Sequence, residues 1–183
     1  CAAGVALAIV QGDSFDRGSI ARLHKDIVVD DASAFLSVFA FQEEIEAALA
    51  VQAANLVRSG GAFREVAREL TDRSAAHGER NAQRLRLQQY STPLTISAVA
   101  QDILRIREGE LVLEPTAGNG TLALGAAAAG ARIEGFELDK ARAERGTRVL
   151  KEAGAQFVNI RPRAFEVNAE GGFGGMAFDA VLA

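Results

Sequence analysis

Cysteine, histidine and tryptophan are almost missing from this chain of 183 residues. It has one cysteine, two histidines and no tryptophan. A single cysteine excludes an internal disulfide framework and a metal site made of several cysteines, and two scattered histidines argue against a zinc site. We therefore expect no bound metal, and we take the cytoplasm as the default location.

Long apolar runs and an excess of positive charge are also lacking. The apolar stretch 5–10 is too short to span a bilayer and has no basic flank, so we expect no membrane partner. The formal net charge of −4 argues against a protein that coats nucleic acid through bulk charge, although it is compatible with a local basic groove. The length allows one domain and an appendage. We expect both ends to be cut from a longer protein, because the chain starts without methionine and stops after a strand-like run.

The most informative stretch is a glycine turn after a short apolar run. Residues 111–113 suit a strand covered on both faces, and we predict a tight turn after it and a helix from Gly120 towards Ala129. Gly118 and Gly120 leave room for a ligand to approach the backbone and permit a positive φ. The helix start would attract an electron-rich group. Glu114 can accept hydrogen bonds from a cationic amine, which suits a ligand with an amino group, such as the methionine end of S-adenosylmethionine.

Two other ligand types compete for this stretch. Gly118, Gly120 and Ala123 fit the dinucleotide pattern G-x-G-x-x-G/A, but three residues separate the first glycine from the strand, whereas that pattern places it close behind. A phosphate-binding P-loop needs Gly-Lys-Ser/Thr, which occurs nowhere in the sequence. A turn that only reverses the chain is the remaining alternative.

Strands and helices alternate from Glu110 onward. We predict further strands at 131–136, 156–160 and 178–182, with a helix over 140–153 that Asp139 caps and Gly154 ends. This alternation predicts an α/β fold with a doubly wound parallel sheet of about four strands, in which ligands bind beyond the carboxyl ends of the strands. Glu137 lies near the offset at which an acid accepts ribose hydroxyls in nucleotide-binding units.

The first part of the chain is expected to be mainly helical. We predict a strand or two over 1–30 and a turn at 12–14. Helices should follow over 32–58, capped by Asp30 or Asp31, and over 62–76. Arginines at 80, 84 and 86 fit a solvated surface better than contacts with nucleic-acid phosphates, because nearby acids balance them.

A further helix is predicted over 94–106. Thr92 is its predicted N-cap, Pro93 its first residue and Gly109 its end. Its predicted buried residues are Ile96, Val99, Ile103 and Leu104. We divide the chain into a helical region, 1–85, and a ligand-binding domain, 86–183, that is truncated at its C-terminal end.

Three segments together resemble a known family. The motifs Gln89-Tyr90-Ser91-Thr92-Pro93, Glu114-Pro115-Thr116-Ala117-Gly118-Asn119-Gly120 and Phe136-Glu137-Leu138-Asp139 resemble, in order, those of adenine-specific (amino) DNA methyltransferases. The first is also similar to phage and plasmid proteins that join a methylase to a helicase. The resemblance implies a Rossmann-like class I methyltransferase sheet and S-adenosylmethionine as cofactor.

The resemblance also implies roles for individual residues. Tyr90, Thr92 and Pro93 would lie over the methionine end of S-adenosylmethionine. The turn would hold its amino acid part through Glu114, Pro115, Thr116, Ala117, Gly118, Asn119 and Gly120. Glu137 would bind the ribose hydroxyls, with Leu138 beside it, and Phe165 would pack near the adenine ring. The family's aspartate before that aromatic is Ala164 here, and Glu166 is its candidate substitute.

The implied activity is methylation of the adenine amino group in DNA, as in restriction-modification, with DNA bound through regions partly outside this chain. The Asn/Asp-Pro-Pro-aromatic motif that binds the target base in this family would begin where the sequence stops, so no residue is assigned to catalysis. The alternatives are a methyltransferase for RNA, protein or a small molecule, an NAD-type oxidoreductase, and an inactive module that binds cofactor and partners.

Overall fold

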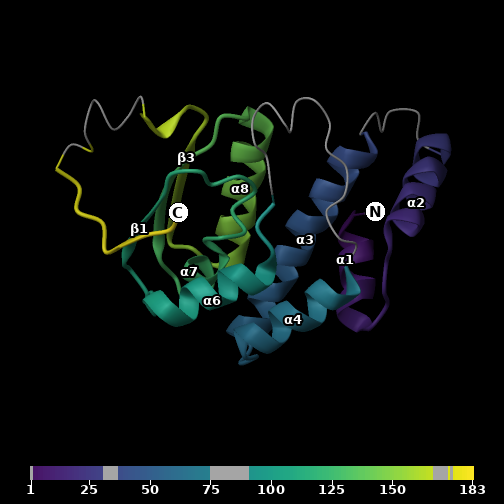
Figure 1. Cartoon of the computed structure of the whole chain (residues 1–183), viewed down its shortest axis with the longest axis horizontal. Helices are drawn as coiled ribbons and strands as arrows, with labels where there is room; N and C mark the ends of the chain where they lie inside the picture. The colour runs from purple at the N-terminus through teal and green to yellow at the C-terminus, as the bar shows by residue number, and fades with distance from the viewer. Residues whose placement is uncertain (1, 31–36, 75–90, 167–172, 174) are drawn as a thin grey trace.

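The computed structural model describes residues 2–30, 37–74, 91–166, 173 and 175–183. A small parallel sheet lies at one side of the molecule, and layers of helices extend from it towards the N-terminus (Figure 1). Helices α6 (Leu94–Leu104), α7 (Leu124–Ala128) and α8 (Lys140–Ala153) lie between the sheet and the N-terminal helices. Among the described residues, no helix is long and apolar enough to cross a membrane.

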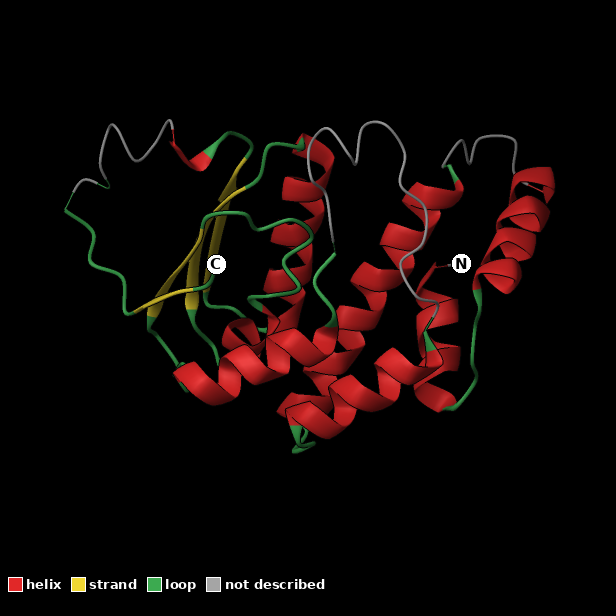
Figure 2. Ribbon diagram, in the orientation of Figure 1, coloured by secondary structure: helices red, strands yellow, loops and turns green. Residues whose placement is uncertain are grey.

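The sheet confirms the predicted α/β class. Its strands are β1 (Leu111–Glu114), β2 (Arg132–Phe136), β3 (Phe157–Arg161) and β4 (Ala180–Val181). They are parallel, in the order β3-β2-β1-β4, as Figure 2 shows in yellow. The strand β4 is shorter than predicted, although the backbone amides of Asp179 and Leu182 also donate hydrogen bonds to β1. In this topology the carboxyl ends of β1 and β2 meet at one edge of the sheet.

Helix α8 is the element that the sequence predicted best. Asp139 is its N-cap and accepts a hydrogen bond from the backbone amide of Arg142, and Gly154 ends it with a φ of 115°. Small and apolar residues face inward along it, including Gly146, Val149 and Leu150, and they pack against the turn after β1 and against β3. The helix therefore forms one wall beside the carboxyl end of β1.

The N-terminal region is helical from its start, so the prediction of strands over 1–30 was wrong. Helices α1 (Ala2–Gln11) and α2 (Arg17–Asp30) flank a turn that begins at Gly12, as predicted. The short apolar run buries Val5 and Ile9, four residues apart, against α3. The pattern of such a short apolar run fits a strand and a buried helix equally well. Here the run is helical because it packs on α3.

Helices α3 (Val38–Arg58) and α4 (Phe63–Arg73) join these helices to the rest. The N-cap of α3 is Ser37, which accepts a hydrogen bond from the amide of Ala40, instead of Asp30, which lies in α2, or Asp31, which lies outside the described residues. One side of α3 packs on α1 and the other on α7 and α8, while α4 packs on α6 (Figure 1). The N-terminal helices and the sheet half therefore share one packed core.

Helix α6 buries a different face from the predicted one. Ile96 and Ile103 are 51% and 71% exposed, and Val99 and Leu104 are exposed as well. Ser97 and Ala98 are buried instead, and the Ser97 hydroxyl donates a hydrogen bond to the carbonyl of Leu122. The helix follows Pro93, which replaces Thr92 as N-cap, and it ends at Arg105 in a left-handed conformation, before Gly109. Small residues pack closely at this interface, so the apolar pattern did not identify the buried face.

Candidate functional site

Glu114 is the most unusual residue at the carboxyl edge of the sheet. It is the last residue of β1 and pairs with Gly135 of β2, yet only 1% of it is exposed. Its carboxyl group accepts a hydrogen bond from the backbone amide of Ala123. Its Oε2 atom has no hydrogen-bond partner among the described residues. Burial raises the pKa of Glu114 well above its usual value, the bond from Ala123 opposes this, and the nearby charge of Glu137 adds to it.

The glycine turn follows directly and takes the backbone across the end of β2. The amide of Ala117 donates to the carbonyl of Phe136, and Gly118 and Gly120 have φ values of 54° and 81°. The predicted helix from Gly120 was wrong, because α7 starts only at Leu124 and has five residues. Residues 121–123 thus separate the turn from α7, and the turn amides do not open a helix.

Gly118 and Gly120 have different neighbours. A side chain on Gly120 would place its Cβ 2.9 Å from Leu150 Cγ, and a Cβ on Gly146 would lie 2.9 Å from the carbonyl oxygen of Gly118. These distances mean that the turn packs tightly on α8. A Cβ on Gly118 would instead lie 3.1 Å from Arg142 Nη2 and 3.9 Å from Glu137 Oε2. Gly118 therefore faces Arg142 of α8 and Glu137, which follows β2.

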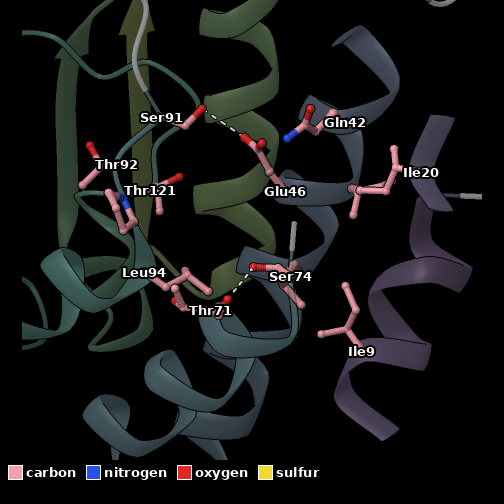
Figure 3. A pocket seen from close by; sticks show the side chains of 13 residues that line it. Ile9, Ile20, Gln42, Glu46, Thr71, Ser74, Ser91, Thr92, Leu94 and Thr121 are labelled. Atoms are coloured by element: carbon pink, nitrogen blue, oxygen red, sulfur yellow. Dashed lines mark hydrogen bonds between the residues drawn. The ribbon is translucent and has the colours of Figure 1, made fainter. Parts of the chain in front are cut away.

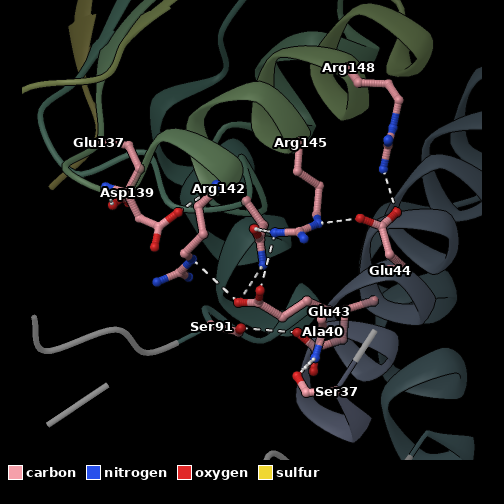
Figure 4. A network of polar contacts seen from close by, with 12 residues as sticks. Ser37, Ala40, Glu43, Glu44, Ser91, Glu137, Asp139, Arg142, Arg145 and Arg148 are labelled. Atoms are coloured by element: carbon pink, nitrogen blue, oxygen red, sulfur yellow. Dashed lines mark hydrogen bonds and ion pairs between the residues drawn. The ribbon is translucent and has the colours of Figure 1, made fainter. Parts of the chain in front are cut away.

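Glu137 lies beside the turn, just after β2. It is half-buried, and its Oε1 accepts a hydrogen bond of 2.9 Å from the backbone amide of Asp139. This bond orients the carboxylate at the start of α8, where Figure 4 shows it beside Asp139 and Arg142. The neighbouring Leu138 is exposed.

A buried polar network, which the sequence analysis missed, lies on the other side of the turn (Figure 4). Glu43 of α3 forms ion pairs with Arg142 (3.5 Å) and Arg145 (3.1 Å) of α8. Arg145 also donates to the side-chain oxygen of Asn119 at 3.1 Å. The adjacent Glu44 pairs with Arg145 and Arg148. The spacing of the three arginines on α8 was the available signal, since positions 142, 145 and 148 lie on one side of a helix.

The two glutamates of this network differ in environment. Burial raises the pKa of Glu43, although Arg142 and Arg145 oppose that effect. Burial alone would also raise the pKa of Glu44, but hydrogen bonds and charges from Arg145 and Arg148 lower it below its usual value. Glu43 is therefore the deeper of the two carboxyl groups, with its side chain 5% exposed against 27% for Glu44.

A cavity of about 330 Å³ lies between the N-terminal helices and the segment before α6 (Figure 3). Thr92, Pro93 and Thr121 line it on the side of the sheet half. The hydroxyl of Ser91 donates a hydrogen bond of 3.0 Å to Glu46 Oε2 at its wall. Its other lining residues are Ile9, Ile20, Gln42, Ile45, Leu49, Thr71, Ser74 and Leu94. Two residues implied to lie over the methionine end thus face a cavity, while the third, Tyr90, lies outside the described residues.

Phe165 belongs to an aromatic cluster beyond β2 and β3. Its ring centre lies 5.5 Å from that of Phe136 and 5.9 Å from that of Phe173, and Phe178 extends the cluster. Arg161 lies over the ring of Phe136, at 5.3 Å from its centre. The cluster provides an apolar surface at the same end of the sheet as Glu137.

The structure brings most of the candidate residues together. Glu114, Ala117, Gly118, Asn119, Gly120 and Glu137 surround the carboxyl ends of β1 and β2. Pro115 is half-buried in the turn and Thr116 is exposed. The arrangement combines two neighbouring carboxyl groups, one of them buried, with a close-packed glycine turn. In physical terms the unpartnered Oε2 of Glu114 favours a ligand with a hydrogen-bond donor.

Comparisons with known proteins find partial likenesses. No family model and no curated protein matches this chain. An RNA methyltransferase from Salinibacter ruber, solved in complex with S-adenosyl-L-homocysteine, matches with 23% identity over 43% of this chain and a TM-score of 0.39. The protein PH0851 matches with 26% identity over 41% of this chain and a TM-score of 0.34. The matches span 53% of the first protein and 18% of the second, so they assign no function to this chain.

Proposed function

We propose that this chain is the cofactor-binding part of an S-adenosylmethionine-dependent methyltransferase. The observation that carries the proposal is the buried carboxyl group of Glu114. Its Oε2 has no partner within the described part of the chain, and it lies at the edge of a parallel sheet where ligands of such folds bind. A buried carboxyl oxygen without a partner is costly unless a ligand completes its hydrogen bonds.

The residues at this edge fit S-adenosylmethionine. Its ammonium group can donate to Glu114, and its ribose hydroxyls can donate to Glu137, which the amide of Asp139 already orients. A cation bound at this edge would favour the ionised form of Glu114, which burial otherwise disfavours. When bound, the cofactor supplies an electrophilic methyl group, while the residues named here bind and orient it.

The NAD-type alternative fits the same residues less well. A pyrophosphate binds to amides at the start of a helix that directly follows the glycines. Here α7 starts four residues after Gly120, so the glycine turn does not open a helix. The G-x-G-x-x-A match is therefore better explained by packing of the turn on α8.

We further propose that the acceptor is the adenine amino group in DNA. The order of the three motifs supports this, because it is the order of adenine-specific DNA methyltransferases. Such enzymes must extrude the target base and align its nitrogen with the methyl group. DNA would be bound by parts of the protein beyond the residues assigned here.

Titration calorimetry of this chain with S-adenosylmethionine, S-adenosylhomocysteine and NAD⁺ tests the first step. We expect binding of the first two and none of NAD⁺, loss of binding in Glu114→Gln, and no change in Glu144→Gln, an exposed residue of α8. Binding of NAD⁺ without a response to S-adenosylmethionine would overturn the assignment. Transfer of labelled methyl groups by the full-length protein to duplex DNA, compared with RNA of the same sequence, tests the acceptor.

A further inference from the structure

The side chain of Asn119 connects the glycine turn to the N-terminal helices. Asn119 is buried, and its amide nitrogen lies 3.5 Å from Glu43 Oε1 of α3. Its amide oxygen accepts a hydrogen bond of 3.1 Å from Arg145 Nη1, the same atom that pairs with Glu43 Oε2. Glu43, Asn119 and Arg145 thus form a closed triangle of contacts between α3, the turn and α8.

The turn needs such a fixed point because glycines flank Asn119 on both sides. Gly118 and Gly120 both have positive φ values. Because glycine has no side chain beyond hydrogen, its backbone can adopt more conformations than that of any other residue, so this turn is easily deformed. Hydrogen bonds at both ends of the Asn119 amide hold the residue between them.

The charges around the turn depend on the same glutamate. Glu43 is an acidic partner of Arg142, whose guanidinium lies beside Gly118. Neutralising Glu43 would increase the positive charge next to the turn and weaken binding of a cation there. Neutralising Glu44 would remove the same charge from the network, but the ion pairs of Glu44 are with Arg145 and Arg148. The contacts with Arg142 and Asn119 are made by Glu43.

We propose that Glu43 is a positioning residue for the cofactor turn, so that helix α3 of the N-terminal region holds the turn in its binding conformation. The proposal rests on the function proposed above. It gives the N-terminal helices a part in cofactor binding, in addition to any contact they make with a substrate.

The test compares Glu43→Gln with Glu44→Gln, which lose the same charge from the same network. Affinity for S-adenosylmethionine is measured by calorimetry, and amide hydrogen exchange of residues 116–123 is measured without ligand. We expect Glu43→Gln to bind about tenfold more weakly, the order of one charge-assisted hydrogen bond, and to exchange faster in the turn. Glu44→Gln should change both the affinity and the exchange less, because Glu44 reaches the turn indirectly, through Arg145. Equal effects of the two variants, or unchanged exchange in Glu43→Gln, would overturn the proposal.

A second variant covers the case in which Glu43→Gln does not fold. Asn119→Ala keeps the ion pairs of Glu43 and removes only the connection to the turn, so it should show the same faster exchange. Unchanged exchange in Asn119→Ala would also overturn the proposal. Because exchange is measured without ligand, it tests the role of Glu43 even if the unchanged protein binds no S-adenosylmethionine, a result that would refute the proposed function alone.

Discussion

Glu114 and Glu137 stand at the carboxyl ends of neighbouring parallel strands, and the charge of Glu137 adds to the effect of burial in raising the pKa of Glu114. Without a ligand, Glu114 therefore resists ionisation. A cation bound beside it would reverse this preference. The first two predictions follow from this relationship.

Replacing Glu114 by glutamine should stabilise the fold and abolish cofactor binding. The folded pKa of Glu114 is raised, so its contribution to stability is greatest at low pH and decreases as the pH rises from the unfolded value through the folded one. Glutamine keeps an acceptor for the Ala123 amide and does not ionise. We expect a gain of about 1–3 kcal/mol in unfolding free energy at pH 8, measured by urea denaturation. Lower stability of the variant at pH 8 would contradict this reading of Glu114.

Binding of S-adenosylmethionine should release a proton. The cationic groups of the ligand favour the ionised form of Glu114 and so lower its pKa in the complex. Affinity should rise with pH over the range in which the free protein still carries the proton. Calorimetry in buffers of different ionisation enthalpy measures the release, and an unchanged enthalpy across those buffers would argue against it.

Adding one methyl group to Gly146 should loosen the turn from α8. The new Cβ would lie 2.9 Å from the carbonyl oxygen of Gly118, a backbone atom that cannot move without the turn. We expect a loss of about 1–3 kcal/mol in stability together with weaker cofactor binding. Gly125→Ala is the matched control, because its Cβ would lie 2.6 Å from Gln101 Cβ, away from the turn. It should lower the melting temperature while cofactor affinity stays the same, and equal losses of affinity would refute the distinction.

Removing the cap of α8 should cost stability by a separate route. Asp139 accepts a hydrogen bond of 3.1 Å from the amide of Arg142, and Asp139→Ala should lower the unfolding free energy by about 1 kcal/mol. Asp139→Ser should recover most of this loss, because serine is also a strong N-cap. The comparison is made by thermal denaturation, and a serine variant no more stable than the alanine variant would show that capping is not the cause.

Local patterns predicted the strands β1 and β2 and the helix α8 because their signals lie within a few residues. Asp139 and Gly154 bound α8 as expected, and the apolar run at 111–113 became a buried strand. The buried face of α6 could not be predicted in this way. Its contact with Leu122 uses Ser97 and Ala98, and small residues carry no strong hydrophobic signal.

The carboxyl groups and the glycine turn of the site could be predicted from the sequence. The buried network of α3 and α8 that holds the turn could not. Glu114, Gly118 and Glu137 lie on adjacent elements, so the topology of a parallel sheet brings them together. The contact of Glu43 with Asn119 joins residues 76 positions apart in sequence and depends on how α3 packs on α8. No short motif encodes such a contact.

The packing of α3 on α8 has a practical consequence for truncated forms of this protein. A piece that begins at residue 86 would lack Glu43 and Glu44, so Arg142, Arg145 and Arg148 would lose these acidic partners and form a more basic ridge. Such a ridge attracts any polyanion through phosphate contacts that do not read base sequence. Binding of DNA by that piece would therefore result from the loss of α3, and it would not identify the natural substrate.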